Sequence, residues 1–260
     1  MANEKCEVRI LDDAGELCRE AAREFTRLAE QAVSRSDMFT VALSGGSTPR
    51  SLYTFLADRN EPFRDRIPWG KIHFFWGDER HVPPDDRESN YRMVYEALFS
   101  KVPVLPGTVH RIQSEMKDAE NAAREYERVL RSFFHLDEEG QWPRFDLVLL
   151  GMGPDGHTAS LFPGSRTLSE RKLLVDAPWV ATISSHRITL TPRVFNNAAA
   201  AIFLTAGEEK AAALRDVIQG KYRPDRFPAQ LIRTAGGSVL WLVDRAAASL
   251  LDSGRGKPPR

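Results

Sequence analysis

The sequence predicts an α/β protein with a mostly parallel sheet and helices on both faces of that sheet. Two observations predict this class. Short apolar runs, each as long as a buried strand, alternate along the chain with longer segments of helical periodicity. Alternating strands and helices form parallel sheets, because a parallel pair needs a long crossover that is usually a helix. The 260 residues allow one large domain of this kind or two small ones.

The individual elements follow from the apolar pattern in chain order. After a first strand at residues 8–11, Asp12 or Asp13 can cap the helix that follows, because a carboxylate accepts from free N–H groups. Pro49 suits the first position of the second helix, where its missing N–H is not needed. The expected strands are 8–11, 39–43, 71–76, 145–150, 179–183, 187–190, 200–204 and 239–243, and the expected helices are 12–34, 49–57, 90–99, 118–134, 208–218 and 229–233.

Composition excludes several classes of function. Lys+Arg and Asp+Glu are both 36, and zero net charge argues against a protein that binds nucleic acid or an anionic membrane through its overall field. Cys6 and Cys18 lack metal-ligand spacing and are interpreted as ordinary thiols. Neither a signal peptide nor an apolar stretch of about 20 residues is found. We therefore expect a cytoplasmic protein, with a flexible tail at residues 252–260.

Three of the predicted strands end in unusual sequence. The strand at 39–43 is followed by SGGSTP, the strand at 71–76 by GDERHVPP, and the strand at 145–150 by GMGPDGH. In open α/β sheets, ligands bind beyond the carboxyl ends of the strands. We therefore expect these three segments to meet at one edge of the sheet and to form a site there.

Residues 151–156, GMGPDG, match the G-x-G-x-x-G pattern of dinucleotide-binding proteins, and Asp176 follows at a distance that would suit a ribose contact. That site needs a helix of about a dozen residues after the third glycine. Here Pro163 and Gly164 break any helix after about seven residues. The glycines therefore indicate a demand on the backbone, and no nicotinamide cofactor is predicted.

The segment Ser44–Thr48 leads from a strand into a helix. Because Gly45 and Gly46 have no side chains, backbone N–H groups can approach an anion closely, and the helix N-terminus adds partial positive charge. The hydroxyls of Ser47 and Thr48 add donors. The Lys-Ser/Thr end of an ATP-binding loop is missing. An ordinary strand–turn–helix with a Thr cap is the alternative interpretation of this segment.

Two cations are candidates for the same edge. Arg80, after the third strand, can offer a bidentate fork to a phosphate, and Asp78 can orient it. Lys210 lies one turn into a helix that follows a strand and can reach over the edge. The alternatives are a surface salt bridge for Arg80 and a solvated lysine for Lys210.

Asp155 and His157 are two residues apart in the tight glycine loop after residues 145–150. An imidazole accepts protons near neutral pH, and the carboxylate can select its tautomer. A solvated loop histidine is the alternative. These residues alone predict a small phosphorylated substrate and acid–base chemistry without a metal. The other histidines show no partner pattern and are assigned no role: His73, His81, His110, His135 and His186.

Four segments resemble, in order, the signature segments of the 6-phosphogluconolactonase family: SGGSTP, GDERHVPPDDRESNYRM, LGMGPDGHTASLFPG and TAGEEK. The resemblance runs from about Val41 to Lys210, and RITLT at 187–191 is also similar. It implies a single Rossmann-like domain, at residues 1–251, of a fold shared with glucosamine-6-phosphate deaminases. It also implies hydrolysis of 6-phosphogluconolactone to 6-phosphogluconate in the oxidative pentose phosphate pathway, without metal or organic cofactor.

The resemblance assigns roles to residues. His157 would be the base that activates water, with Asp155 beside it. The phosphorylated sugar lactone would be the only partner, bound by a monomer or weak homodimer. The residues expected to bind it are Ser44, Gly45, Gly46, Ser47, Thr48, Arg80, Gly153, Gly156, Arg187 and Lys210.

Two rival functions are less well supported. Deaminases of this superfamily typically carry a glutamate shortly after the Asp-Gly-His triplet and a tyrosine after Asp-Glu. Here the loop continues Thr-Ala-Ser-Leu-Phe-Pro, and Arg80 follows Asp78-Glu79. A sugar-phosphate sensor within a transcription regulator would need a DNA-binding module, and no helix-turn-helix precedes the first strand. Both comparisons favour the lactonase.

Overall fold

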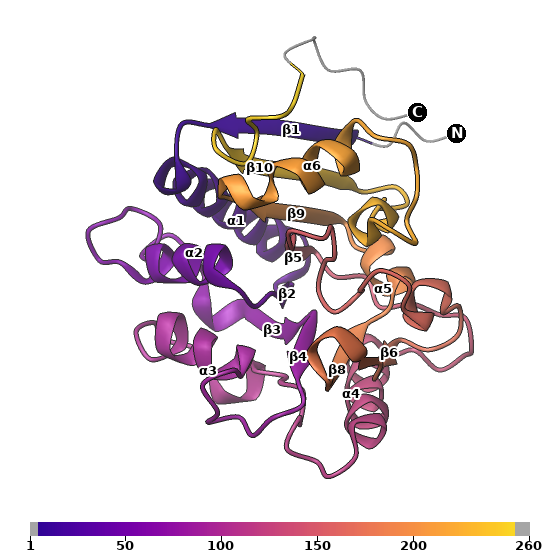
Figure 1. Ribbon diagram of the computed structural model, residues 1–260. Coiled ribbons are helices and arrows are strands. Elements are labelled where there is room, and N and C mark those ends of the chain that lie inside the picture. Colours follow the sequence, from indigo (N-terminus) through magenta and orange to yellow (C-terminus); the bar gives the residue numbers. More distant parts are fainter. Residues whose placement is uncertain (1–4, 253–260) are drawn as a thin grey trace.

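The computed structural model describes residues 5–252 and shows a single α/β domain (Figure 1). Its main sheet has six strands in the order β1-β10-β9-β5-β2-β3, and all neighbouring pairs are parallel. The predicted fold class is therefore confirmed. The strands of this sheet are β1 Lys5–Leu11, β2 Phe39–Leu43, β3 Ile72–Trp76, β5 Leu147–Gly151, β9 Ala200–Thr205 and β10 Ser238–Asp244. Of the predicted tail, residues 253–260 lie outside the described part of the chain.

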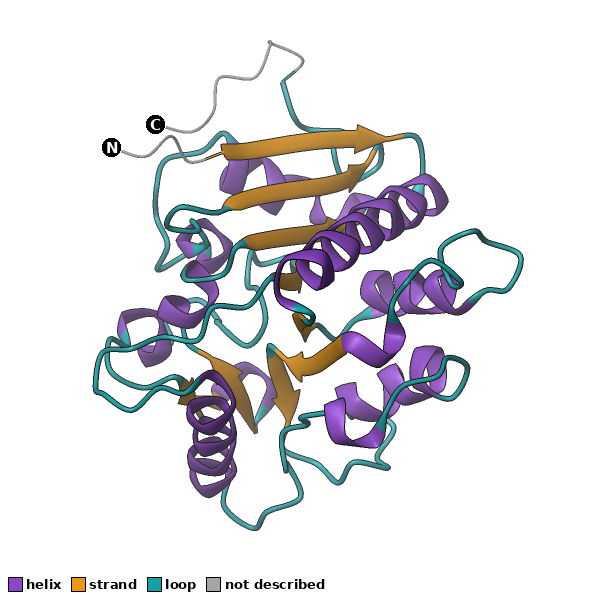
Figure 2. Ribbon diagram, turned by 180° about the vertical axis from the view of Figure 1, so that it is seen from behind, coloured by secondary structure: helices purple, strands orange, loops and turns teal. Residues whose placement is uncertain are grey.

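Helices cover both faces of the sheet. Figures 1 and 2 view it from opposite sides and show α1 against one face and α6 against the other. Of the two predicted cap residues, Asp13 caps α1 and accepts from the Glu16 N–H at 2.9 Å. Asp118, predicted as the first helical residue, instead caps α4. The helices are α1 Ala14–Ser36, α2 Ser47–Ala57, α3 Asn90–Val94, α4 Ala119–Phe134, α5 Pro192–Asn196 and α6 Ala211–Ile218.

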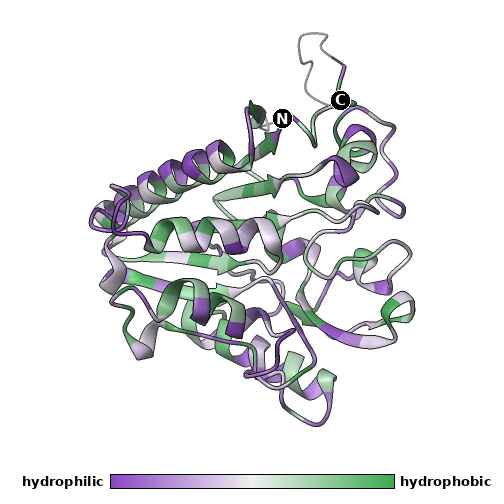
Figure 3. Cartoon of the chain, turned by 60° about the vertical axis from the view of Figure 1, so that its left-hand side comes forward, coloured by the Kyte–Doolittle hydropathy of each residue, from purple (hydrophilic) through white to green (hydrophobic). Residues whose placement is uncertain are grey.

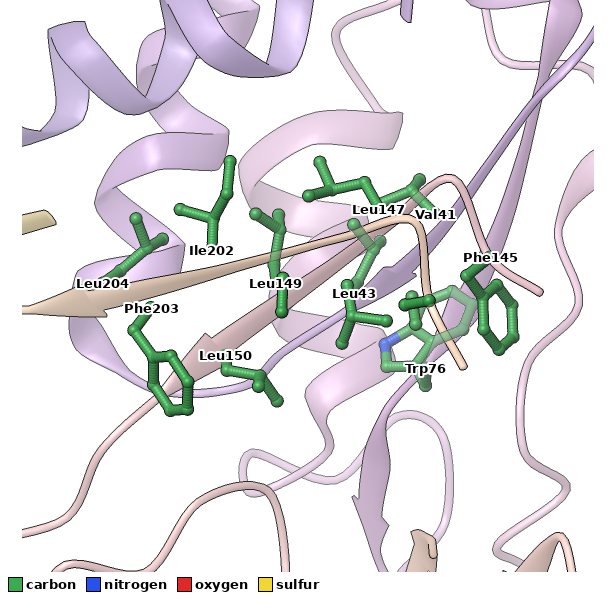
Figure 4. Close-up of a cluster of buried hydrophobic side chains, with 14 of the residues drawn as sticks. Val41, Leu43, Trp76, Phe145, Leu147, Leu149, Leu150, Ile202, Phe203 and Leu204 are labelled. Carbon is green, nitrogen blue, oxygen red and sulfur yellow. The ribbon is translucent and has the colours of Figure 1, made fainter. Parts of the chain in front are cut away.

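The core lies between the sheet and its helices. Figure 3 shows hydrophobic residues along the strands, and mixed hydrophilic and hydrophobic stretches along the helices. The side chains of β2, β3, β5 and β9 form its centre, as in the cluster of Val41, Leu43, Trp76, Leu149 and Phe203 (Figure 4). These strands are buried on both faces, which explains why they are continuous apolar runs in the sequence.

A second, smaller sheet extends from the carboxyl end of β3. It has the order β4-β8-β6 and is antiparallel, with β7 paired to β8. Its strands are β4 Asp78–Arg80, β6 Val175–Asp176, β7 Trp179–Val180 and β8 Ser185–Leu190. The sequence predicted a loop where β4 lies. Three charged residues carry no strand pattern, so β4 exists only because β8 pairs with it.

Several predicted boundaries were wrong for local reasons. Helix α2 begins at Ser47, two residues before Pro49, because Gly46 adopts φ 101° and caps it. The strand predicted at 179–183 ends after Val180, and a 3-10 turn follows, since only two residues find a partner strand. The helix predicted at 229–233 is a 3-10 turn, Pro228–Leu231, and the one predicted at 208–218 starts as such a turn before α6.

Two histidines without an assigned role form a pair beside β3. His73 Nδ1 lies 3.1 Å from His110 Nε2, and both rings pack against Phe133. Partial burial lowers the pKa of both imidazoles. The pKa of His110 falls to about 4, first through burial and then through the charge of His73. The fold therefore favours a neutral, hydrogen-bonded pair.

This pair predicts an acid-sensitive contribution to stability. A histidine in the unfolded chain has a pKa of about 6.5, whereas the pKa of His110 in the folded protein is about 4. The unfolded state therefore binds protons at a higher pH than the folded state. The stabilisation by this pair is fully present above pH 6.5 and is lost as the pH falls toward 4. His110→Gln should lower the melting temperature at pH 7.5 and reduce its further loss between pH 7 and pH 5. Thermal unfolding across this range, with the exposed His135→Asn as control, measures the effect. Equal pH slopes for wild type and His110→Gln would contradict it.

Candidate active site

The segments that follow four neighbouring strands, β3, β2, β5 and β9, enclose a cavity at the carboxyl edge of the main sheet. The three unusual strand ends singled out in the sequence therefore do meet, and the segment after β9 joins them. Nine of the predicted site residues line this cavity, namely Ser44, Gly45, Gly46, Ser47, Thr48, Arg80, Gly153, His157 and Lys210.

The backbone after β2 presents free donors to the cavity. Gly46 caps α2 without any side-chain cap, so the N–H groups of the first turn have no intrahelical partner. Within the described chain, no hydrogen bond uses the N–H groups of residues 45–48. Four consecutive donors and the positive end of an 11-residue helix are thus available to an anion.

A buried tyrosine holds this segment in place. The Tyr53 hydroxyl accepts from the Ser44 N–H at 3.0 Å and donates to the Ser44 carbonyl at 2.9 Å. The Tyr126 hydroxyl makes the same two bonds, at 2.8 and 3.1 Å, to Trp76 at the end of β3. Burial raises the pKa of both hydroxyls, which stay protonated and can donate. Two strand ends that border the cavity are therefore fixed by side chains.

Three cations lie at this edge and lack an ion-pair partner among the described residues. Within residues 5–252, Arg80, Arg187 and Lys210 form no ion pair. Arg187 does not line the cavity, but it lies directly opposite Arg80 in the β4–β8 ladder, where like charges repel. Burial, followed by the charge of Arg80, lowers the pKa of Arg187. An anion would relieve this repulsion.

The contact expected between Asp78 and Arg80 is not formed. Arg80 Nη1 donates to the Glu88 carbonyl at 2.8 Å, and Asp78 Oδ2 accepts instead from Ser160 Oγ at 2.7 Å. Arg80 is thus oriented by a backbone carbonyl, a contact that no sequence pattern indicated. The sequence pattern also missed Asn90, which lines the cavity with Asp78 and whose motif was noted only as part of the family resemblance.

The imidazole of His157 is held on three sides. Its Nδ1 lies 2.6 Å from Asp155 Oδ1, its ring stacks on Phe162 at 4.4 Å, and its Cε1 and Nδ1 atoms lie close to Gly153. Nε2 has no hydrogen bond within the described residues. Partial burial alone would raise the pKa of the Asp155 carboxyl, but the hydrogen bond and charge of His157 outweigh it and lower that pKa. Asp155, which lies outside the cavity lining, therefore orients the ring as a carboxylate.

Two glycines of this loop are required by close contacts. A Cβ on Gly153 would lie 2.2 Å from His157 Cε1, so any side chain would displace the imidazole. Gly156 adopts φ 81°, and a Cβ there would lie 2.8 Å from Phe227. Gly156 therefore shapes the loop from behind the cavity. Ala159 lines the cavity with φ 47°, a strained value for a residue other than glycine.

The helix that the dinucleotide pattern would require does not follow the glycine loop, as Pro163 and Gly164 predicted. Between Gly156 and the 3-10 turn Arg166–Ser169 the chain forms turns and a short bridge, Thr158 to Leu161, and no helix. Asp176 lies in the small sheet and accepts from Thr167 Oγ1 at 2.6 Å. Among the described residues, no three His, Cys, Asp or Glu side chains are grouped to hold a metal. None of the described helices is long and apolar enough to cross a membrane.

Comparison with known proteins gives consistent matches along the chain. The family model for glucosamine-6-phosphate isomerases/6-phosphogluconolactonase matches residues 12–241. A 6-phosphogluconolactonase of Synechocystis sp. is 38% identical over 230 residues, which cover 87% of this chain and 90% of that protein. One from Nostoc sp. is 36% identical, over 94% and 98% of the two chains. The solved structure of a 6-phosphogluconolactonase from Trypanosoma cruzi is 30% identical with a TM-score of 0.81, over 95% and 97% of the chains.

The tyrosine contact predicts a specific loss of stability. Tyr53→Phe leaves the buried N–H and carbonyl of Ser44 without their partner, which should lower the free energy of unfolding by about 1–3 kcal/mol. Urea unfolding measures this loss, and Tyr95→Phe, at a half-exposed tyrosine of η2 (Tyr95–Phe99), is the matched control. Equal stability of the two variants would show that the hydroxyl of Tyr53 contributes nothing.

Proposed function

Because the chain belongs to the glucosamine-6-phosphate isomerase/6-phosphogluconolactonase family, we propose that it hydrolyses 6-phospho-D-glucono-1,5-lactone to 6-phospho-D-gluconate, with His157 as general base. The observation that supports this most directly is the cavity itself. It brings the imidazole of the His157–Asp155 pair together with a helix N-terminus that has no side-chain cap and with cations that form no ion pair among the described residues. The reaction places this protein in the oxidative pentose phosphate pathway, as the resemblance implied.

The phosphate is bound far from the reacting carbon. Arg80, Lys210 and the N–H groups of residues 45–48 supply positive charge and donors, and Arg187 adds positive charge from the neighbouring strand. A phosphate fixed there orients the lactone, so that its C1 carbonyl lies near His157. This orientation makes the attack of water effectively intramolecular.

His157 transfers the proton in both halves of the reaction. Nε2 removes a proton from water as the water oxygen bonds to C1, and a tetrahedral oxyanion forms. The carbonyl then re-forms, the bond from C1 to the ring oxygen breaks, and the imidazolium returns the proton to that oxygen. Asp155 stabilises the imidazolium through its hydrogen bond to Nδ1. No group other than water and the lactone is consumed.

The deaminase alternative is weaker. That chemistry, in the pattern compared above, uses a glutamate after the Asp-Gly-His triplet, and residues 158–164 contain no acidic side chain. The relatives at 36–38% identity carry the name 6-phosphogluconolactonase. Both observations support lactone hydrolysis.

The proposal predicts a large effect at His157. His157→Ala should lower kcat by roughly 10²–10⁴, with little change in KM, since the phosphate contacts remain. Asp155→Asn should act in the same direction but less strongly. The assay follows the disappearance of lactone formed by glucose-6-phosphate dehydrogenase, with spontaneous hydrolysis subtracted. Near-wild-type turnover of a folded His157→Ala protein would remove this residue from the mechanism.

The phosphate contacts predict a separate effect on binding. Arg80→Ala and Lys210→Ala should each weaken substrate binding by about ten- to a hundredfold, the usual loss for one charge-assisted contact. Lys117→Ala, at an exposed lysine, is the matched control. Unphosphorylated gluconolactone should be a poor substrate of the wild type. If it were hydrolysed as efficiently as the phosphorylated lactone, the assignment of the phosphate site would be wrong.

A further inference from the structure

Asp78 places a buried carboxylate in the wall of the cavity. Its exposed fraction is 7%, and it is the first residue of β4. Two carboxylate oxygens offer about four acceptor sites. Within the described chain they receive one short bond, from Ser160 Oγ at 2.7 Å, and one long contact, 3.5 Å, from Asn90 Nδ2. No ion pair with a described cation compensates the charge. A buried carboxylate with so few donors is costly unless a ligand supplies more.

The chemistry of the cavity decides which ligand group fits Asp78. The proposed function assigns substrate binding to several other polar groups of the cavity wall. All of them are hydrogen-bond donors, namely the N–H groups of residues 45–48, Arg80 and Lys210. They match a phosphate, whose dianion has only acceptors. The lactone carbonyl likewise only accepts. The hydroxyl groups of the sugar chain are the donors of this substrate, and they lie between its phosphate and its C1.

We propose that Asp78 is a specificity-determining residue that accepts hydrogen bonds from hydroxyl groups of the phosphorylated lactone. This inference rests on the proposed function, because it assumes a substrate whose hydroxyls lie between the phosphate and C1. The fixed negative charge also repels the phosphate from this wall. This charge thereby favours one orientation of the substrate in the cavity.

Asn90 is the positioning residue for this contact. Its Nδ2 donates to the Asp78 carbonyl at 2.9 Å, and its backbone N–H donates to Glu79 Oε1 at 2.7 Å. Its Oδ1 lies only 2.0 Å from where a Cβ on Gly45 would be. The carboxamide of Asn90 thus occupies the space that any side chain at position 45 would need. Asn90 therefore sets the spacing between the hydroxyl acceptor and the phosphate-binding segment.

The test compares one isosteric variant with substrates that lack single hydroxyls. The full-length wild type and Asp78→Asn are assayed for kcat/KM on 6-phosphogluconolactone and on its 2-, 3- and 4-deoxy counterparts, made by oxidising the deoxyglucose 6-phosphates. Asp78→Asn should lose about ten- to a hundredfold on the complete substrate. For at least one deoxy lactone, the kcat/KM of the wild type should fall by a similar factor relative to the complete substrate. The kcat/KM of Asp78→Asn on that deoxy lactone should be little lower than its own value on the complete substrate. Asp85→Asn, at an exposed carboxylate of the following loop, should behave as wild type throughout.

The outcomes separate this inference from the proposed function. If the wild type does not accelerate hydrolysis of the complete lactone, the proposed function fails. If the wild type is active but Asp78→Asn loses the same factor on every substrate, Asp78 acts structurally and the inference is overturned. Circular dichroism monitors the folding of each variant. If Asp78→Asn does not fold, the same substrate series is measured with Asp78→Ser. The wild-type measurements also test the inference without any variant. Equal kcat/KM on all four lactones would show that no hydroxyl is recognised.

Discussion

Everything in the cavity depends on how the backbone is held where β2 and β3 leave the sheet. A peptide group at such a point loses its ladder partners while it is still buried, which is costly. Two fully buried tyrosines, from helices far apart in the sequence, supply the missing partners at Ser44 and Trp76. Each hydroxyl accepts from the N–H and donates to the carbonyl of one residue. The segments that carry the anion-binding donors and β4 thus start from fixed positions.

The charges of the site are arranged around this fixed backbone. Arg80 and Arg187 are placed side by side by the β4–β8 ladder, Lys210 follows β9, and all three lack ion pairs within the described chain. Asp78, on the same short strand as Arg80, is bonded to Ser160 rather than to a cation. The protein therefore maintains separated charges at some cost in stability, which an anionic polyol can offset. Separation of this kind is typical of binding sites rather than of structural ion pairs.

The glycines of the loop after β5 are needed for close contacts and a tight turn rather than for flexibility. Gly153 leaves room for the imidazole, Gly156 permits the turn against Phe227, and His157 is held between Asp155 and Phe162. Preorganisation of the base requires that the ring have one orientation before substrate arrives. The same glycines form a dinucleotide-like pattern, yet no helix follows them. The glycine spacing matches a dinucleotide-binding pattern although the structure does not, because spacing does not specify which residues pack behind the loop.

The sequence by itself determined the parallel α/β fold, an aspartate cap at position 12 or 13, and the meeting of three strand ends, because periodicity, capping and the parallel crossover rule act locally. It also identified most residues of the cavity, first as candidates in the strand-end motifs and then through the family resemblance. Only the tertiary structure decided the strand β4, the bond from Ser160 to Asp78, the fit of Asn90 against Gly45, and the His73–His110 pair. These features join residues at least 37 positions apart, and no local propensity encodes which side chains meet at such separations.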